Sequence, residues 1–439
     1  MGAAKKGVFI MTITNSNIYK VPEIIPTATQ ISLNGHDRNN KEKKYVLSDR
    51  SVCLLGSPGC GKTSTILRIL DDLSKNPMAV TVILDMKRDF VKKAFRPGDV
   101  VLSLFDIEGV PKESQVKWSL LNEAYNDTHP EIILYEIASM IYQSAVEGSE
   151  NKAFPISAKF IFYAILFITY KESNGKMPSN KELIHKAETI TPSKLLEDIE
   201  KYDELASVRN LVTEKQNVTS WGIQMEKARV LADLFVKKSN FCHENSDFSI
   251  RDFIHRGKGH RLIIVLDIES RSSSENIAKL LLDIALKEAL SGDDLEYSDM
   301  TRYYFVLDEY AYLPCGGLEY LDFAKDMGRS KGLRIIGAFQ HFSQLKKLYG
   351  GKLENAMNDA AGYGDIVVFH PHDGATRDFV LNRCGTEMKE TVTIDAMCNV
   401  HTEVKEMPVV PPGVLNELKC GEAVILPDEG RPFWFYFDE

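Results

Sequence analysis

The sequence lacks the cysteine spacing of a disulfide framework or of a zinc site. Its seven cysteines are scattered over 439 residues, with no CxxC pair or Cys/His cluster. Scattered cysteines are typical of reduced, mostly structural thiols in a reducing compartment. Internal repeats and low-complexity tracts are also missing, and 44% hydrophobic and 26% charged residues are ordinary for a folded protein. At this length two domains are expected.

Long hydrophobic runs are missing too. The longest, Phe160–Tyr170, has eleven residues, whereas a membrane-spanning helix needs about 20. The N-terminal stretch MGAAKKGVFIMTITNS has two lysines but no apolar stretch long enough for a signal peptide. We therefore expect no direct membrane span, a cytoplasmic protein, and a buried helix at Phe160–Tyr170.

An excess of positive charge is absent as well, because the net charge is −9 and the pI is about 5.7. This weighs against a protein that simply coats DNA, but it leaves room for a local basic channel. Three basic clusters exist, none interleaved with aromatic residues for base stacking, so a solvated face is the simpler interpretation of each. They are Lys87, Arg88, Lys92, Lys93 and Arg96; His255, Arg256, Lys258, His260 and Arg261; and Lys346, Lys347 and Lys352.

A phosphate-binding loop is clearly present in residues 51–64, SVCLLGSPGCGKTS. An apolar strand runs into a glycine-rich turn and then into an amphipathic helix, so that backbone N–H groups and the helix dipole face the phosphates. Lys62 would reach the β- and γ-phosphates of ATP, and the Thr63 hydroxyl would bind Mg²⁺. The predicted nucleotide-binding residues are Gly56, Ser57, Pro58, Gly59, Cys60, Gly61, Lys62, Thr63 and Ser64.

A second nucleotide motif has to be chosen among three strands that end in aspartate, at Asp85, Asp267 and Asp308. ATP hydrolysis needs one carboxylate that positions Mg²⁺ through water and another that orients the attacking water. Only Asp308 is followed directly by a glutamate. Asp308 is therefore predicted to position Mg²⁺, and Glu309 is predicted to orient the attacking water. Strand-end caps or loop anchors are the simpler interpretation of Asp85 and Asp267.

Two further residues follow this motif. Gln340 stands at the end of the strand Leu333–Phe339, where an amide would contact the γ-phosphate or its water; an ordinary loop hydrogen bond is the alternative. Arg329 lies in the turn Gly328–Gly332, from which it would reach the nucleotide of a neighbouring subunit. A surface arginine without a catalytic role is the alternative for Arg329.

The order of elements predicts an α/β fold with a mainly parallel sheet and an inserted all-α domain. Short β-branched and aromatic runs separated by helices are typical of such a sheet, and helical periodicity replaces them in the middle of the chain. The predicted strands are 52–56, 80–85, 99–104, 262–267, 303–308, 334–339 and 365–370. The predicted domains are an N-terminal arm or linker at 1–45, a nucleotide-binding domain at 46–122 and 251–439, and the all-α insert at 123–250. Residues 1–45, which end in the polar run GHDRNNKEKK, are expected to form an appended strand or arm plus a flexible loop.

The segment DEYAYLP…GRSKGLRIIGAFQHFSQLKKLYG resembles the type IV secretion coupling proteins, the TraG/TraD-type ATPases of bacterial conjugation. The matching positions are Asp308-Glu309, Gly328–Gly332, Gln340, Gln344-Leu345 and Tyr349-Gly350. Two weaker matches follow the phosphate loop: Asp85-Met86-Lys87-Arg88-Asp89 is similar to an Asp-Pro-Lys-Gly-acidic segment, and Trp118-Ser119-Leu120-Leu121-Asn122 to a Trp-Asn-Pro-Leu pattern. The chain departs from the family at His341, where serine is frequent, and after Asp85.

The resemblance implies a RecA-like P-loop NTPase of the FtsK–HerA superfamily. Such proteins form rings, usually hexamers, that use ATP to translocate single- or double-stranded DNA, and their all-α domain recognises secretion or relaxosome proteins. Family members usually begin with transmembrane helices; here a partner would hold the chain at the inner face of the membrane. Two alternatives stay open: a soluble HerA-like ATPase of DNA processing or defence, and an ATP-switched substrate adaptor that translocates nothing.

Overall fold

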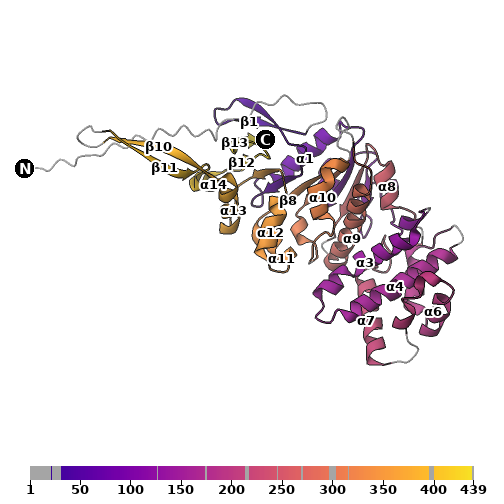
Figure 1. The fold of residues 1–439 in the computed structure, drawn as a ribbon. Coiled ribbons are helices and arrows are strands. Elements are labelled where there is room, and N and C mark those ends of the chain that lie inside the picture. The colour runs from indigo at the N-terminus through magenta and orange to yellow at the C-terminus, as the bar shows by residue number, and fades with distance from the viewer. Residues whose placement is uncertain are drawn as a thin grey trace, which may run out of the picture. The chain divides into compact units, whose positions relative to one another are not determined.

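The computed structural model describes residue 21 and residues 31–125, 127–173, 176–212, 217–244, 246–267, 270–295, 303–314, 316–394 and 400–437. Most of the predicted N-terminal arm, together with Cys315 and Cys398, lies outside these residues. The chain divides into two compact units (Figure 1). Unit 1 comprises Met1–Asp72, Ala338–Ser343 and Tyr363–Glu439, and unit 2 comprises Leu73–Gly337 and Gln344–Gly362.

Unit 1 contains a mixed sheet. Its strands follow the order β2 (Glu42–Val46), β1 (Ser32–His36), β13 (Phe433–Phe437), β12 (Glu422–Leu426), β9 (Asp365–Val368) and β3 (Val52–Leu55). The β3–β9 pair is parallel, and the other neighbours are antiparallel. The helices are α1 (Lys62–Leu73), α13 (Gly374–Cys384) and α14 (Pro412–Glu417), and β10 (Thr386–Ile394) with β11 (Val400–Pro408) forms a separate hairpin.

The polar run GHDRNNKEKK is a β-hairpin, so the prediction of a flexible loop there was wrong. Strands β1 and β2 pair from Ser32 opposite Val46 to His36 opposite Glu42. The turn is held by Asp37, whose Oδ1 accepts hydrogen bonds from the backbone N–H groups of residues 39 and 41. Strand β1 also pairs with β13, at the other end of the chain. An appended strand was one of the two expectations for residues 1–45, and β1 agrees with it. Its pairing with β13 was not predicted, because no local pattern records a partner so distant in sequence.

Unit 2 contains a parallel sheet in the order β7 (Tyr303–Asp308), β4 (Val80–Asp85), β6 (Arg261–Val265) and β5 (Val100–Leu102). Every residue of β4, β6 and β7 is buried. Helices α2 (Asp89–Ala94) and α9 (Arg271–Leu290) pack on these strands, as expected for a parallel sheet. The strands predicted from the sequence are therefore confirmed, and β8 (Leu333–Phe339) carries the chain from unit 2 into unit 1.

The predicted helical region is also confirmed. Its helices are α3 (Pro130–Gly148), α4 (Ala153–Glu172), α5 (Asn180–Thr189), α6 (Pro192–Ile199) and α7 (Val218–Leu234), of which α3, α4, α6 and α7 are seen together in Figure 1. Proline at the first position of α3 and of α6, and the capping boxes at Ser179 and Asn217, fix four helix starts. The remaining helices of unit 2 are α8 (Ile250–Arg256), α10 (Leu321–Met327), α11 (Phe342–Leu348, which begins in unit 1) and α12 (Leu353–Ala361).

Helix α4 is the centre of this helical region and contacts α3, α5, α6 and α7. Residues 161–168 are buried, which confirms the buried helix predicted at Phe160–Tyr170. Within the described residues, α4 alone has the length and apolar composition of a membrane span, and 61% of its apolar window is buried inside the protein. Burial of this kind is equally typical of a core helix in a globular protein.

Both ends of the helical region meet at Glu123, which is 1% exposed. Its carboxylate accepts hydrogen bonds from Trp118 Nε1 at 2.6 Å, from the backbone N–H of Ile250 at 2.7 Å, and from the N–H of Arg251 and Ser249 Oγ at 3.0 Å. Burial raises the pKa of Glu123 to about 7, although these four donors favour the ionised carboxylate. The buried carboxylate of Glu123 thus links the start of the helical region to its end at residues 249–251.

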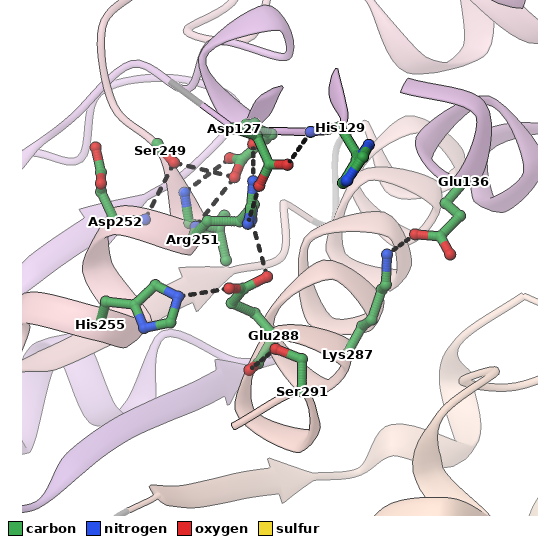
Figure 2. Close-up of polar contacts among 12 residues, drawn as sticks. Asp127, His129, Glu136, Ser249, Arg251, Asp252, His255, Lys287, Glu288 and Ser291 are labelled. Carbon is green, nitrogen blue, oxygen red and sulfur yellow. Dashed lines mark hydrogen bonds and ion pairs between the residues drawn. The ribbon is translucent and has the colours of Figure 1, made fainter. Parts of the chain in front are cut away.

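Arg251, whose backbone N–H binds Glu123, also belongs to the ion-pair network drawn in Figure 2. Its guanidinium lies between two carboxylates, with Nη2 2.8 Å from Asp127 Oδ2 and Nε 2.8 Å from Glu288 Oε2. Glu288 also lies 2.5 Å from His255 Nε2. Because Glu288 belongs to α9 and His255 to α8, the network ties the base of the helical region to the helix that covers the parallel sheet.

Candidate active site

The phosphate loop joins β3 to α1 in unit 1. Gly56, Gly59 and Gly61 have φ angles of 152°, 74° and 116°, which residues with a side chain rarely adopt. At Gly56 a Cβ atom would also lie 2.7 Å from the Cβ of Phe369. Both observations explain why glycine is required where the backbone curls around the position of a phosphate.

Lys62 is held inside this loop. Its side chain is buried, and Nζ donates to the carbonyl oxygens of Gly56 at 2.6 Å and Ser57 at 3.0 Å. Ser57 in turn donates from its backbone N–H and its hydroxyl to the carbonyl of His370, two residues after the end of β9. The ammonium group therefore stands at the mouth of the loop with oxygen partners that phosphate oxygens can replace.

The other loop residues differ in their exposure. Pro58, Gly59 and Ser64 are exposed, Thr63 is half-buried and Cys60 is buried. Burial raises the pKa of the Cys60 thiol, so it stays protonated and acts as a small filler. The described cysteines, 53, 60, 242, 384 and 420, are all free thiols, as predicted.

Gln340 lies close to the phosphate loop within unit 1. The backbone N–H of Gly56 donates to the carbonyl oxygen of Phe339 at 3.4 Å, and Gln340 is the next residue in the chain. Its side chain is half-buried. Gln340 therefore stands beside the phosphate loop, and its role as a sensor of the γ-phosphate stays a prediction.

Asp308 and Glu309 stand at the end of β7 in unit 2, and both are buried. Glu309 adopts the left-handed conformation, with φ 55°, which is uncommon for a residue other than glycine and marks a constrained backbone. The next residue, Tyr310, is fully buried and donates its hydroxyl hydrogen bond to Asp359 Oδ2. Because Asp359 is also paired with Lys325, the turn that presents Glu309 is tied to α10 and α12.

Asp85 anchors the loop after β4, as the simpler interpretation of this residue predicted. Its carboxylate accepts hydrogen bonds from the backbone N–H groups of residues 87, 89 and 91. Burial raises the pKa of Asp85, while these N–H donors act in the opposite direction. The anchored loop places two cations against carboxylates: Lys87 Nζ lies 3.3 Å from Glu309 Oε1, and Arg88 Nη2 lies 3.4 Å from Asp267 Oδ2.

Sequence reasoning missed the roles of Lys87 and Arg88, which it assigned to a basic cluster on a solvated face. The signal that could have found them was the likeness of residues 85–89 to a family segment. Asp267 is paired with Arg88 and is therefore the strand-end loop anchor that was expected.

Arg329 lies in the 3₁₀ turn Gly328–Lys331 before β8, and its side chain is exposed. Gly332 closes the turn with φ 67°, and Ser330 Oγ donates to Asp294 Oδ1 at 2.9 Å. The turn is thus ordered, and Arg329 lies on the surface of unit 2.

The predicted metal ligands, Thr63 and Asp308, belong to different units. Within the described residues, no group of three or more histidine, cysteine, aspartate or glutamate side chains could by itself hold a metal ion. The assignment of Thr63 and Asp308 as Mg²⁺ ligands stays a prediction.

Comparisons with known proteins agree with this architecture. The family model described as the type IV secretion-system coupling protein DNA-binding domain matches residues 44–403. The conjugal transfer protein TraG of Agrobacterium fabrum is 24% identical over 199 residues, which are 41% of this chain and 29% of TraG. The chain thus spans less than a third of the length of the curated relatives it matches.

Solved structures support the predicted fold class. The unbound bacterial conjugative coupling protein TrwBdeltaN70 has a TM-score of 0.70 at 20% identity, covering 89% of this chain and 84% of that chain. VirB4 of Thermoanaerobacter pseudethanolicus has a TM-score of 0.59 at 13% identity, covering 95% and 98%. The RecA-like P-loop α/β fold with its helical insert is therefore confirmed. Because the family model also matches well over half of the chain, the protein belongs to the type IV secretion-system coupling protein family.

Proposed function

We propose that this protein is an ATP-hydrolysing motor that binds and translocates DNA in conjugative transfer. The observation that carries the proposal is the phosphate loop with Lys62 held at its mouth by two carbonyl oxygens. Membership of a family described as a DNA-binding domain supports DNA as the substrate. Solved TrwB structures in complex with ADP and Mg²⁺ and with an ATP analogue support the choice of nucleotide and metal.

In the proposed mechanism, the glycine-rich loop and the first N–H groups of α1 bind the phosphates of ATP. Lys62 exchanges its carbonyl partners for β- and γ-phosphate oxygens and neutralises their charge. Thr63 and Asp308 would hold Mg²⁺, which supplies further positive charge to the phosphates. Gln340 contacts the γ-phosphate or the attacking water.

Hydrolysis then requires an oriented water molecule. Glu309 accepts a hydrogen bond from this water and takes its proton as the water oxygen bonds to the γ-phosphorus. The bond between the γ-phosphorus and the β–γ bridging oxygen breaks, which gives ADP and phosphate. Arg329 of a neighbouring subunit stabilises the charge that develops on the phosphoryl group.

This role requires partners that belong to the same proposal. The chain forms a ring around its DNA, and the proposed ring is a hexamer. The helical region 123–250 contacts secretion or relaxosome proteins. A partner protein holds the ring at the inner face of the membrane.

The test is the ATPase rate of the wild type, Lys62→Ala and Glu309→Gln, each with and without single- and double-stranded DNA. Lys62→Ala should lose about 10²–10³-fold in turnover, because the phosphates lose their ammonium partner. Glu309→Gln should bind ATP normally, measured by fluorescence of a labelled nucleotide, and should not hydrolyse it.

Other outcomes point to other functions. Normal turnover by Glu309→Gln would contradict its assignment. Slow turnover that DNA does not change would favour an ATP-switched adaptor. DNA-stimulated turnover with translocation of DNA that is not coupled to conjugative transfer would favour a HerA-like processing or defence ATPase.

A further inference from the structure

The ion pair between Lys87 and Glu309 joins two neighbouring strands at the edge where the proposed chemistry takes place. Strands β4 and β7 run parallel, with Leu84 opposite Leu307, so the residues that follow them leave the sheet at the same edge. Lys87 Nζ lies 3.3 Å from Glu309 Oε1 and is a hydrogen-bond donor to it. The residue proposed to orient water thus has an ammonium group on one of its two oxygens.

The loop that carries Lys87 is rigidly placed. Asp85 is fully buried and accepts three backbone hydrogen bonds from the loop and from the start of α2. Arg88 adopts the left-handed conformation, with φ 59°. The side chains of Lys87 and Arg88 therefore point toward the two different strands that flank β4. Lys87 pairs with the carboxylate that follows β7, and Arg88 pairs with Asp267, which follows β6.

The two partners of the first pair differ in exposure. The Lys87 side chain is 49% exposed, whereas the Glu309 side chain is 3% exposed. Burial alone would lower the pKa of Lys87, but the carboxylates of Glu309 and Asp308 raise it, and the net shift is upward. Lys87 is therefore a charged ammonium that an anion in solution can reach, whereas the Glu309 carboxylate is buried.

An ammonium group on Glu309 opposes the role that the glutamate has in hydrolysis. A carboxylate that orients water needs an acceptor oxygen that no other donor holds, and Lys87 holds Oε1 of Glu309. The pair must therefore open before Glu309 acts on water. The exposed ends of Lys87 and Arg88, side by side on one loop, are suited to the phosphates of a nucleic-acid backbone.

We propose that Lys87 holds Glu309 in a resting ion pair, and that DNA backbone phosphates bound by Lys87 and Arg88 release it. Lys87 is thus a positioning residue that couples DNA binding to hydrolysis. The proposal rests on the proposed function, in which Glu309 orients the attacking water.

The test compares the full-length wild type with Lys87→Met, Lys87→Arg and Lys93→Met. Lys93 is the matched control, because it lies on the following helix, is similarly exposed and pairs with Asp89 rather than with Glu309. Steady-state ATPase is measured with and without single- and double-stranded DNA, at one pH and one salt concentration for every variant. Nucleotide affinity and thermal unfolding are measured alongside.

Lys87→Met should raise the DNA-free rate about fivefold, the factor expected for loss of a partly exposed ion pair. Its rate with DNA should approach that of the wild type, so the stimulation ratio falls. Lys87→Arg should keep the wild-type ratio because it keeps the cation, and Lys93→Met should behave as the wild type. Nucleotide affinity should not change in any of the variants.

Two results would overturn the proposal: rates of Lys87→Met that fall equally with and without DNA, or a stimulation ratio equal to that of the wild type. Failure of the proposed function looks different. A wild type that hydrolyses ATP at the same rate with and without DNA would contradict DNA coupling itself and would overturn release by DNA with it. In that case the wild type and Lys87→Met would both have a ratio of about one between the rates with and without DNA.

Discussion

Lys62 and Glu309 are charged side chains that the fold keeps away from water, at 5% and 2% exposure. A buried charge is costly unless it has partners. Lys62 has two backbone carbonyl oxygens and Glu309 has the ammonium of Lys87. At both positions the partner is a group that substrate or solvent can replace, which is what a site that must bind and release phosphate requires.

Glu123 gives a prediction about stability and pH. Because burial raises its pKa from 4.5 to about 7, the folded protein holds more protons than the unfolded chain between these pH values. The contribution of Glu123 to stability is therefore present below pH 4.5 and is lost as the pH rises to 7. We expect the unfolding free energy of the wild type, relative to Glu123→Gln, to fall by about 3 kcal/mol over this range.

Urea denaturation at several pH values measures this difference. Glu113→Gln is the control, because Glu113 is exposed, and its curve should parallel the wild type. Parallel curves for the wild type and Glu123→Gln would show that Glu123 is ionised in the folded protein at all these pH values.

Asn180 gives a second prediction for a single residue. It is fully buried at the start of α5, where Oδ1 accepts from the N–H of Leu120 and Nδ2 donates to the carbonyls of Trp118 and Phe241. Asn180→Ala leaves these backbone groups without their partner and should lower the unfolding free energy by about 3 kcal/mol. The neighbouring Lys181→Ala should change it by less than about 0.5 kcal/mol. Similar midpoints in urea for the two variants would contradict this role.

At the scale of elements, the parallel strands β7, β4 and β6 place four carboxylates and two cations at one edge of the unit 2 sheet. Strands β4 and β7 end in an aspartate, and Asp267 lies two residues after β6. The loop after β4, the middle strand, reaches both neighbours through Lys87 and Arg88. Loops at the carboxyl ends of parallel strands are the usual place for ligand binding in open α/β sheets. The two ion pairs follow from this arrangement, because β4 lies between the other two strands.

The helical region gives a prediction at the same scale. The segment 123–250 contains α3 to α7, and its two ends are joined at Glu123. We expect the isolated segment to fold as a compact helical domain, with a helix-rich circular dichroism spectrum and cooperative thermal unfolding. A β-rich spectrum, or a helical spectrum without cooperative unfolding, would contradict the predicted domain division.

At the scale of the whole molecule, activity is predicted to depend on assembly. Arg329 is exposed in an ordered turn, and the proposed role requires the nucleotide of a neighbouring subunit. Specific ATPase activity should therefore rise with protein concentration or with DNA that promotes ring formation. Mixing Arg329→Ala with Glu309→Gln subunits should recover part of the activity, because some interfaces then carry both intact residues.

Mass measurement of the mixed assemblies is the control for this experiment. If the two variants assemble together and no activity returns, a trans role of Arg329 is contradicted, and Arg334, at the start of β8, is the next candidate.

The sequence alone determined the phosphate loop, the strands of the parallel sheet, the helical region and the Asp308-Glu309 pair. These features are local: glycine spacing, apolar runs and helical periodicity depend on residues close together in the chain. The roles assigned to the residues of the phosphate loop and to Asp308, Glu309, Gln340 and Arg329, and the domain boundaries, stay predictions.

Only the tertiary structure decided which residues far apart in the sequence are in contact. Strand β1 exists beside β13, Glu123 is buried by residues 249–251, and Lys87 meets Glu309 across 222 positions of the chain. In each case the contact forms because packing of the sheet brings the chain segments together, and no periodicity or spacing records it. For this reason Lys87, which the sequence predicts to be a solvated surface charge, is the partner of the buried Glu309.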